Sequence, residues 1–86
     1  MLRLHFALGQ LAWRLNQLPL AENAFVQVLF LNPSDHQTRF LLAQVYEREG
    51  KLQDALRECN YVLAPLGSTN PMVYQVHQRL KQRLGL

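Results

Sequence analysis

The sequence predicts an all-α protein of five helices, arranged as antiparallel helix–turn–helix repeats. Three observations lead to this prediction. The 86 residues are rich in helix-forming Leu, Gln, Ala and Arg, and they include only four Gly and four Pro. Apolar residues recur at helical spacing along most of the chain. The chain also aligns with itself at an offset of 34 residues.

The internal repeat is clear from a simple self-alignment. Residues 2–33 align without gaps on residues 36–67, and residues 70–86 align again on the start of the second unit. Chance pairing in a chain this rich in Leu and Gln would give about two to three identities, whereas eight occur. They are Phe6/Phe40, Leu8/Leu42, Gln10/Gln44, Arg14/Arg48, Leu18/Leu52, Ala21/Ala55, Val28/Val62 and Leu29/Leu63.

These alignments indicate a single domain over residues 1–86. The first repeat spans about 2–35, the second spans about 36–69, and a lone C-terminal helix over about 70–85 completes the stack as a cap. The composition is 49% apolar, which is ample for a core and too high for a disordered chain.

The first unit begins with a helix over about 2–15. Asn16 follows it and takes the turn position that Gly50 holds in the second unit. Pro19 suits the first turn of the next helix, because a missing N–H costs nothing there. This second helix is expected to run to about Leu31.

The second unit shows clearer helix boundaries. Ser34 stands three residues before Gln37 and predicts a capping box at the start of its first helix. Gly50 suits the left-handed residue that ends this helix. The second helix starts near Leu52 and is expected to stop at Pro65, because proline disfavours a continuing helix.

The last helix follows a loop with the sequence LGSTN. Asn70 can cap this helix, Pro71 can begin it, and Gly85 marks its end. With no partner helix after it, this helix is predicted to close the stack.

The 34-residue period and the residues that recur on it resemble the tetratricopeptide repeat. In that family a small residue stands where the two helices of a repeat come close, and Gly9 and Ala43 hold this position. Ala21 and Ala55 match the small residue of the second helix. Other matching positions are Leu8, Ala12, Phe25, Val28 and Pro33 in the first unit, and Leu42, Tyr46, Cys59 and Val62 in the second. The resemblance implies a right-handed α-solenoid that acts as a non-catalytic adaptor or scaffold for protein–protein interaction.

The resemblance also implies a concave groove for an extended peptide, lined by the first helix of each repeat. Helical phase places two ladders on this side, with four further side chains beside them. The ladders are Phe6–Phe40–Tyr74 and Gln10–Gln44–Gln78, and the neighbours are Trp13, Arg14, Arg48 and Lys81. Amides can pair with any peptide backbone, and arginines favour acidic partners. The alternative is that the aromatic residues only pack between helices and the glutamines are only solvated.

A second candidate surface lies on the first helix, where Leu4, Leu8, Leu11 and Leu15 form a stripe. An end helix of a repeat stack is expected to be polar on its outer side. The stripe therefore indicates self-association or packing against a preceding repeat. In this alternative function the chain is a stacking or oligomerisation segment of a larger repeat protein, and Leu4, Leu11 and Leu15 make the contact.

No chemistry beyond protein binding is indicated. His5, His36 and His77 lie at different helical phases without ligands at metal spacing, so no metal site is expected. The sequence holds no phosphate loop, nucleophile motif or paired carboxylates, so we expect no cofactor, no small-molecule substrate and no enzymatic activity. A charge of +3 without a dense basic cluster argues against a nucleic-acid partner. No apolar run reaches a membrane span and Cys59 is the single cysteine, so the default location is cytoplasmic.

Overall fold

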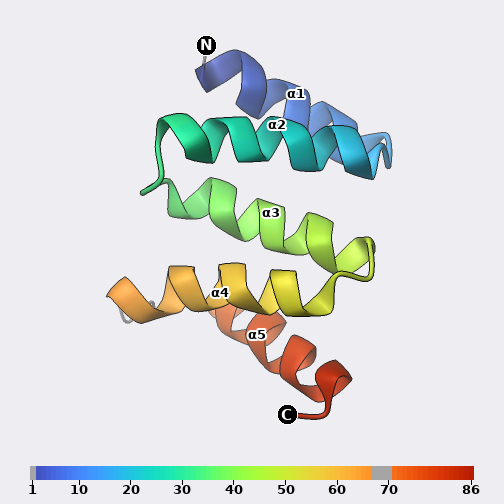
Figure 1. The fold of residues 1–86 in the computed structure, drawn as a ribbon, viewed down its shortest axis with the longest axis vertical. Coiled ribbons are helices and arrows are strands. Elements are labelled where there is room, and N and C mark those ends of the chain that lie inside the picture. Colours follow the sequence, from blue (N-terminus) through green and yellow to red (C-terminus); the bar gives the residue numbers. More distant parts are fainter. Residues whose placement is uncertain (1, 67–70) are drawn as a thin grey trace.

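Five α-helices form the described part of the protein, residues 2–66 and 71–86 of a computed structural model (Figure 1). They are α1 (Leu2–Arg14), α2 (Leu18–Leu31), α3 (His36–Arg48), α4 (Leu52–Leu66) and α5 (Pro71–Leu84). No strand occurs within these two ranges, and the predicted all-α fold is confirmed.

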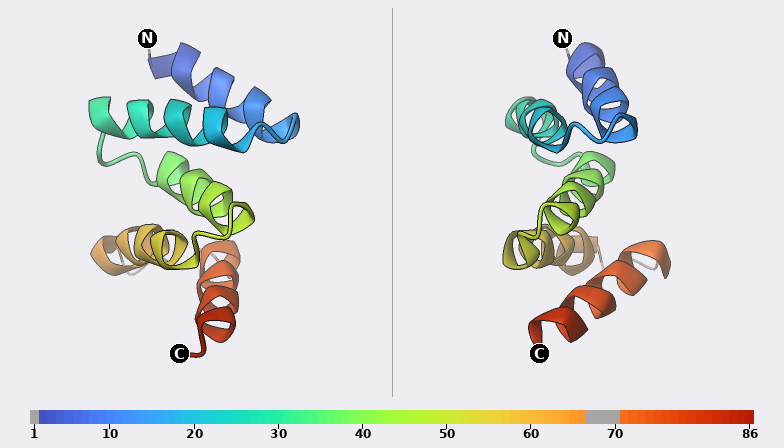
Figure 2. Two further views of the ribbon diagram at one scale, coloured as in Figure 1. Left: turned by 45° about the vertical axis from the view of Figure 1, so that its right-hand side comes forward. Right: turned by 90° about the vertical axis from the view of Figure 1, so that its right-hand side faces the viewer.

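The helices stack in the order of the sequence. Each helix packs chiefly on the helix before it and the helix after it, and the molecule measures 36 × 26 × 18 Å. In the right-hand view of Figure 2, α2 and α4 lie on one side of the stack, while α1 and α3 lie on the other, where α5 begins. This alternation follows from short turns between antiparallel neighbours, and it gives α1, α3 and the start of α5 a common side.

The turns inside the two units are alike. Asn16 has a φ of 60° and Gly50 a φ of 81°, so both residues are left-handed. The N–H of Gln17 donates to the carbonyl five residues earlier at 2.8 Å, and the N–H of Lys51 does the same at 2.9 Å. This is the hydrogen bond of a Schellman motif. The predicted turn positions are confirmed, and asparagine can replace glycine because it tolerates the left-handed region better than most residues.

The N-cap of α3 differs from the predicted one. Asp35 is the cap, because its carboxylate accepts from the backbone N–H of Thr38 at 3.1 Å and from the Thr38 hydroxyl at 2.9 Å. The hydroxyl of Ser34 donates to the Asn32 side chain instead, at 3.1 Å. The predicted capping box of Ser34 and Gln37 is therefore wrong. A carboxylate is favoured here because it also meets the positive end of the helix dipole.

The ends of the other helices agree with the sequence with one exception. Pro19 lies in the first turn of α2 and Gly85 is left-handed after α5, as predicted. However, α4 ends at Leu66, so Pro65 lies inside the helix and does not stop it. A proline removes one backbone hydrogen bond, a loss that a helix tolerates more easily at its end than at its centre. The predicted cap Asn70 lies outside the described residues.

Two clusters of buried residues hold the stack together, and α3 belongs to both. The first cluster consists of Ala12, Ala21, Phe25, Leu42 and Val45, and the second consists of Ala43, Ala55, Cys59, Val76 and Leu80. The first joins α1, α2 and α3, and the second joins α3, α4 and α5. Burial of this apolar surface is the main stabilising contribution to the fold.

Gly9 allows α1 and α2 to come close. A Cβ atom at this position would lie 2.5 Å from the ring of Phe25, which is itself buried. The small residue expected at this position is therefore required by a specific aromatic ring. In the second unit, Ala43 and Ala55 are likewise fully buried.

Candidate functional site

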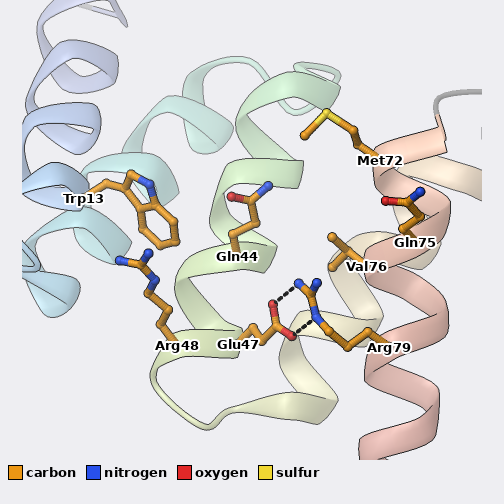
Figure 3. Close-up of a pocket in the computed structure, with 8 residues that line it drawn as sticks. All are labelled: Trp13, Gln44, Glu47, Arg48, Met72, Gln75, Val76 and Arg79. Carbon is orange, nitrogen blue, oxygen red and sulfur yellow. Dashed lines mark hydrogen bonds and ion pairs between the residues drawn. The ribbon is translucent and has the colours of Figure 1, made fainter.

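A pocket of about 300 Å³ opens between α3 and α5, beside the end of α1 (Figure 3). Its lining combines one tryptophan, two amides, three charged side chains and two apolar ones. The lining residues are Trp13, Gln44, Glu47, Arg48, Met72, Gln75, Val76 and Arg79. Residues from three helices thus share one surface on the side of the stack where α1, α3 and the start of α5 lie.

Trp13 and Arg48 form one end of this pocket. The guanidinium carbon of Arg48 lies 4.2 Å from the centroid of the Trp13 ring, which is within the range of cation–π attraction. Trp13 is partly buried against the first core cluster, and Arg48 is exposed. The indole therefore holds the guanidinium at the pocket edge, where its N–H groups can meet a ligand.

Glu47 and Arg79 connect the two walls of the pocket. Arg79 donates two hydrogen bonds of 2.7 Å to the Glu47 carboxylate, and Arg83 approaches the same carboxylate at 3.5 Å. The Arg79 hydrogen bond is the main cause that holds the pKa of Glu47 below its ordinary value. The carboxylate therefore stays ionised and tied to α5 at neutral pH.

The remaining lining suits a polypeptide. Gln44 on α3 and Gln75 on α5 lie across the pocket from each other (Figure 3), and each amide can both donate and accept. Val76 and Met72 add apolar surface from α5. This combination can bind backbone amides and carbonyls beside an apolar side chain.

Three of the predicted groove residues lie together in this pocket, namely Trp13, Gln44 and Arg48. Gln10 and Arg14 are exposed on α1 and do not line the pocket.

Two predicted aromatic residues serve the packing of the helices. Phe6 is partly buried, with its ring centroid 6.1 Å from that of Phe25. Phe40 is partly buried against the second core cluster. These contacts agree with the packing alternative for this part of the aromatic ladder.

On α5 the structure differs from the sequence prediction. The expected side chains, Tyr74, Gln78 and Lys81, do not line the pocket. They lie about 110–170° around the helix from the side chains that do. The cause is the buried stripe of α5, formed by Val73, Val76 and Leu80, which sets the rotation of this helix. A prediction based on the 34-residue period assumed that α5 keeps the rotation of α3.

Five lining residues were not among the predicted site residues: Glu47, Met72, Gln75, Val76 and Arg79. Glu47 lies three residues after Gln44, about 60° around the helix and so on the same side of it, and this spacing could have identified Glu47. The four on α5 could have been found only by recognising that its apolar stripe fixes its rotation.

Charge around the pocket is unbalanced. Arg48, Arg79 and Arg83 lie in or beside it, and Glu47 is the single carboxylate among them. Elsewhere in the described ranges the shortest ion pairs are Arg39–Glu58 at 3.0 Å, Lys51–Glu22 at 2.9 Å and Arg57–Asp54 at 3.0 Å, and Lys51 and Arg57 each approach a second carboxylate. The pocket therefore carries a local excess of positive charge.

The described ranges hold neither a cluster of metal ligands nor a membrane-spanning helix. Within residues 2–66 and 71–86, no group of three or more His, Cys, Asp or Glu side chains could hold a metal ion. No helix in these ranges has the length and apolar character needed to cross a membrane.

Comparison with known proteins identifies the repeat. A family model described as "Tetratricopeptide repeat" matches residues 6–71, which is most of the chain. No curated protein and no solved structure matches the chain. The family model and the helix pairs agree, and proteins of this kind act as scaffolds for protein–protein interaction. The chain belongs to the tetratricopeptide repeat family.

Proposed function

We propose that this protein is a non-catalytic interaction module that binds an extended, acidic peptide segment on the surface shared by α1, α3 and α5. The observation that carries the proposal is the pocket in which Gln44 lies between two arginines, Arg48 and Arg79, with an excess of positive charge.

The pocket offers a contact for each part of such a peptide. The amides of Gln44 and Gln75 can pair with its backbone whatever its sequence. Arg48, which forms no ion pair with any described residue, can take a carboxylate. Val76 supports an apolar side chain.

The proposed path continues beyond the pocket toward α1. Gln10 and Arg14 are exposed there and repeat the spacing of Gln44 and Arg48 one unit earlier. Tyr74, Gln78 and Lys81 are turned away from the pocket lining and lie off this path.

The test uses Trp13 as an internal reporter, because it is the single tryptophan of the chain and lines the pocket. Short glutamate-rich peptides and lysine-substituted counterparts are titrated while Trp13 fluorescence is recorded. The acidic peptides should bind, and their affinity should fall as salt rises, because exposed charges are screened. The double variant Gln44→Ala/Arg48→Gln should weaken binding by about tenfold or more.

The matched control is Gln53→Ala/Arg57→Gln on α4. It removes the same two residue types at the same four-residue spacing, from exposed positions that do not line this pocket. Its affinity should equal that of the unaltered protein. Equal losses in both double variants, or tighter binding of the lysine peptides, would contradict the proposal.

A further inference from the structure

A second, smaller pocket lies near the starts of α1 and α3. It has a volume of about 260 Å³ and is lined by Arg3, Phe6, Val28, Asp35 and Gln37. These residues come from the start of α1, the end of α2, and the N-cap and first turn of α3. None of them lines the larger pocket between α3 and α5, so the smaller pocket is a separate site.

The two pockets follow one another along α1 and α3. On α1, Phe6 lines the smaller pocket and Trp13 lines the larger one, and on α3 Gln37 and Gln44 are divided in the same way. Both pairs are seven residues apart, which is within about 20° of two full turns, so the members of each pair lie on the same side of their helix. Exposed Gln10 lies between Phe6 and Trp13. The pockets therefore lie on one continuous surface, about 10 Å apart along the helix axes.

The buried part of the smaller pocket is apolar. Val28 is only 2% exposed and Phe6 is partly buried, while Gln37 is exposed at the edge, where its amide can pair with a peptide backbone. Sites for whole small molecules usually measure about 300–1,000 Å³. A pocket below this range, with apolar residues inside and an amide at its edge, suits a single apolar side chain of a longer ligand.

The two charged residues of the smaller pocket differ in their partners. Both carboxylate oxygens of Asp35 accept hydrogen bonds from Thr38, at 3.1 and 2.9 Å. Arg3 is exposed and forms no ion pair with any described residue. The charge left for a ligand is therefore positive, as it is at Arg48 beside the larger pocket. A ligand that crosses both pockets should be acidic outside its apolar side chain.

From this we propose that the smaller pocket takes one apolar side chain, such as leucine, from the same acidic peptide whose carboxylate meets Arg48 at the larger pocket. This inference rests on the proposed function and specifies its ligand further. An extended peptide advances about 3.3 Å per residue, so three or four residues span the distance of about 10 Å between the pockets. The preferred ligand therefore carries an apolar residue three or four positions from an acidic one.

Peptides with one pair of adjacent glutamates in a serine and asparagine background test this spacing. A single leucine is placed one, three or four positions from the glutamates, on either side, and alanine replaces it in the matched peptides. Titrations with Trp13 fluorescence should show that leucine at position three or four, on one side, tightens binding about fivefold or more relative to alanine. Leucine at position one should give less than a twofold gain, because it cannot reach the smaller pocket.

The variant Gln37→Phe tests the pocket itself, because it adds bulk from an exposed position at the edge and leaves the buried residues in place. It should abolish the preference for leucine while the alanine peptides keep their affinity within about twofold. The control Gln53→Phe makes the same change at an exposed position on α4 that lines neither pocket, and it should keep the full preference.

Methyl NMR locates the contact and shows that the variants are folded. The methyl signals of Val28 should move on addition of the leucine peptide but not the alanine peptide, whereas those of buried Val45, which lines neither pocket, should stay in place. Three outcomes would overturn the inference and leave the proposed function standing: no gain from leucine, an equal gain at every spacing, or a gain that persists in Gln37→Phe. Failure of every acidic peptide to bind would overturn both.

Discussion

Arg79 of α5 donates two hydrogen bonds of 2.7 Å to the carboxylate of Glu47 of α3 (Figure 3). This contact ties α5 to α3 across the pocket. We expect Glu47→Gln to lower the free energy of unfolding by about 1 kcal/mol. The Glu47 side chain is only 12% exposed, but Arg79 is 53% exposed, and solvent screening there limits the contribution of the pair. Urea unfolding followed by circular dichroism measures the change.

Asp54→Asn is the matched control, because it removes a carboxylate from a pair with Arg57 in which both side chains are well exposed. Asp54→Asn should lower the free energy of unfolding by less than about 0.5 kcal/mol.

The pKa of Glu47 is lowered chiefly by the Arg79 hydrogen bond, so the stabilising effect of Glu47 is present above pH 4.5 and is lost as the pH falls below that value. The difference between the unaltered protein and Glu47→Gln should shrink on acidification. A difference that does not change with pH would show that the pair does not stabilise the fold.

Gly9→Ala should destabilise the protein, although the same change in an exposed helix is stabilising. The added Cβ would lie 2.5 Å from the Phe25 ring, so α1 and α2 must move apart or the ring must shift. We expect a loss of about 1–3 kcal/mol in thermal or urea unfolding. Adding Phe25→Leu makes room for the methyl group, so the double variant should be more stable than the sum of the two single losses predicts. Strictly additive losses would mean that the two residues do not compete for space.

Cys59 should be unreactive in the folded protein. Its side chain is fully buried in the second core cluster, and burial raises the pKa of the thiol to about 11, so little thiolate exists at neutral pH. A chromogenic disulfide reagent should therefore modify Cys59 only as fast as the protein unfolds. A Gln53→Cys variant, which adds an exposed thiol on the same helix, should show one fast and one slow thiol. Two fast thiols would contradict the buried position.

The helices and their turns could be predicted from the sequence because each is encoded locally. The stop signals of α1 and α3 depend on a single left-handed residue, Asn16 or Gly50, and the repeat period fixes the order of the helices. The cap of α3 was predicted wrongly because Ser34 and Asp35 are both good caps, and only the bond to Thr38 decides between them.

The rotation of α5 could not be predicted from the repeat alone. It depends on the burial of Val73, Val76 and Leu80, of which Val76 and Leu80 pack with residues of α3 and α4 in the second core cluster. This packing is tertiary, so the local sequence does not determine it. For the same reason, Trp13, Gln44 and Arg48 were predicted together with side chains that do not line their pocket. The repeat period predicts where a helix lies in the sequence more reliably than it predicts which way a side chain points on a lone end helix.

His77 should make the protein less stable in mild acid. Its Nε2 lies 2.8 Å from Oδ1 of Asn60, so Nε2 carries the proton and Nδ1 must accept the second one. Nδ1 is buried and has no hydrogen-bond partner among the described residues. Burial, with a smaller effect of Lys81, lowers the pKa of His77 below 6.5. The stability that neutral His77 contributes is therefore present above pH 6.5 and is lost as the pH falls through the folded-state pKa.

His77→Gln should flatten the stability profile between about pH 7 and pH 5, measured by urea unfolding, because glutamine cannot titrate. Asn60→Ala should lower stability across this range without flattening it, and an unchanged slope in His77→Gln would contradict this account.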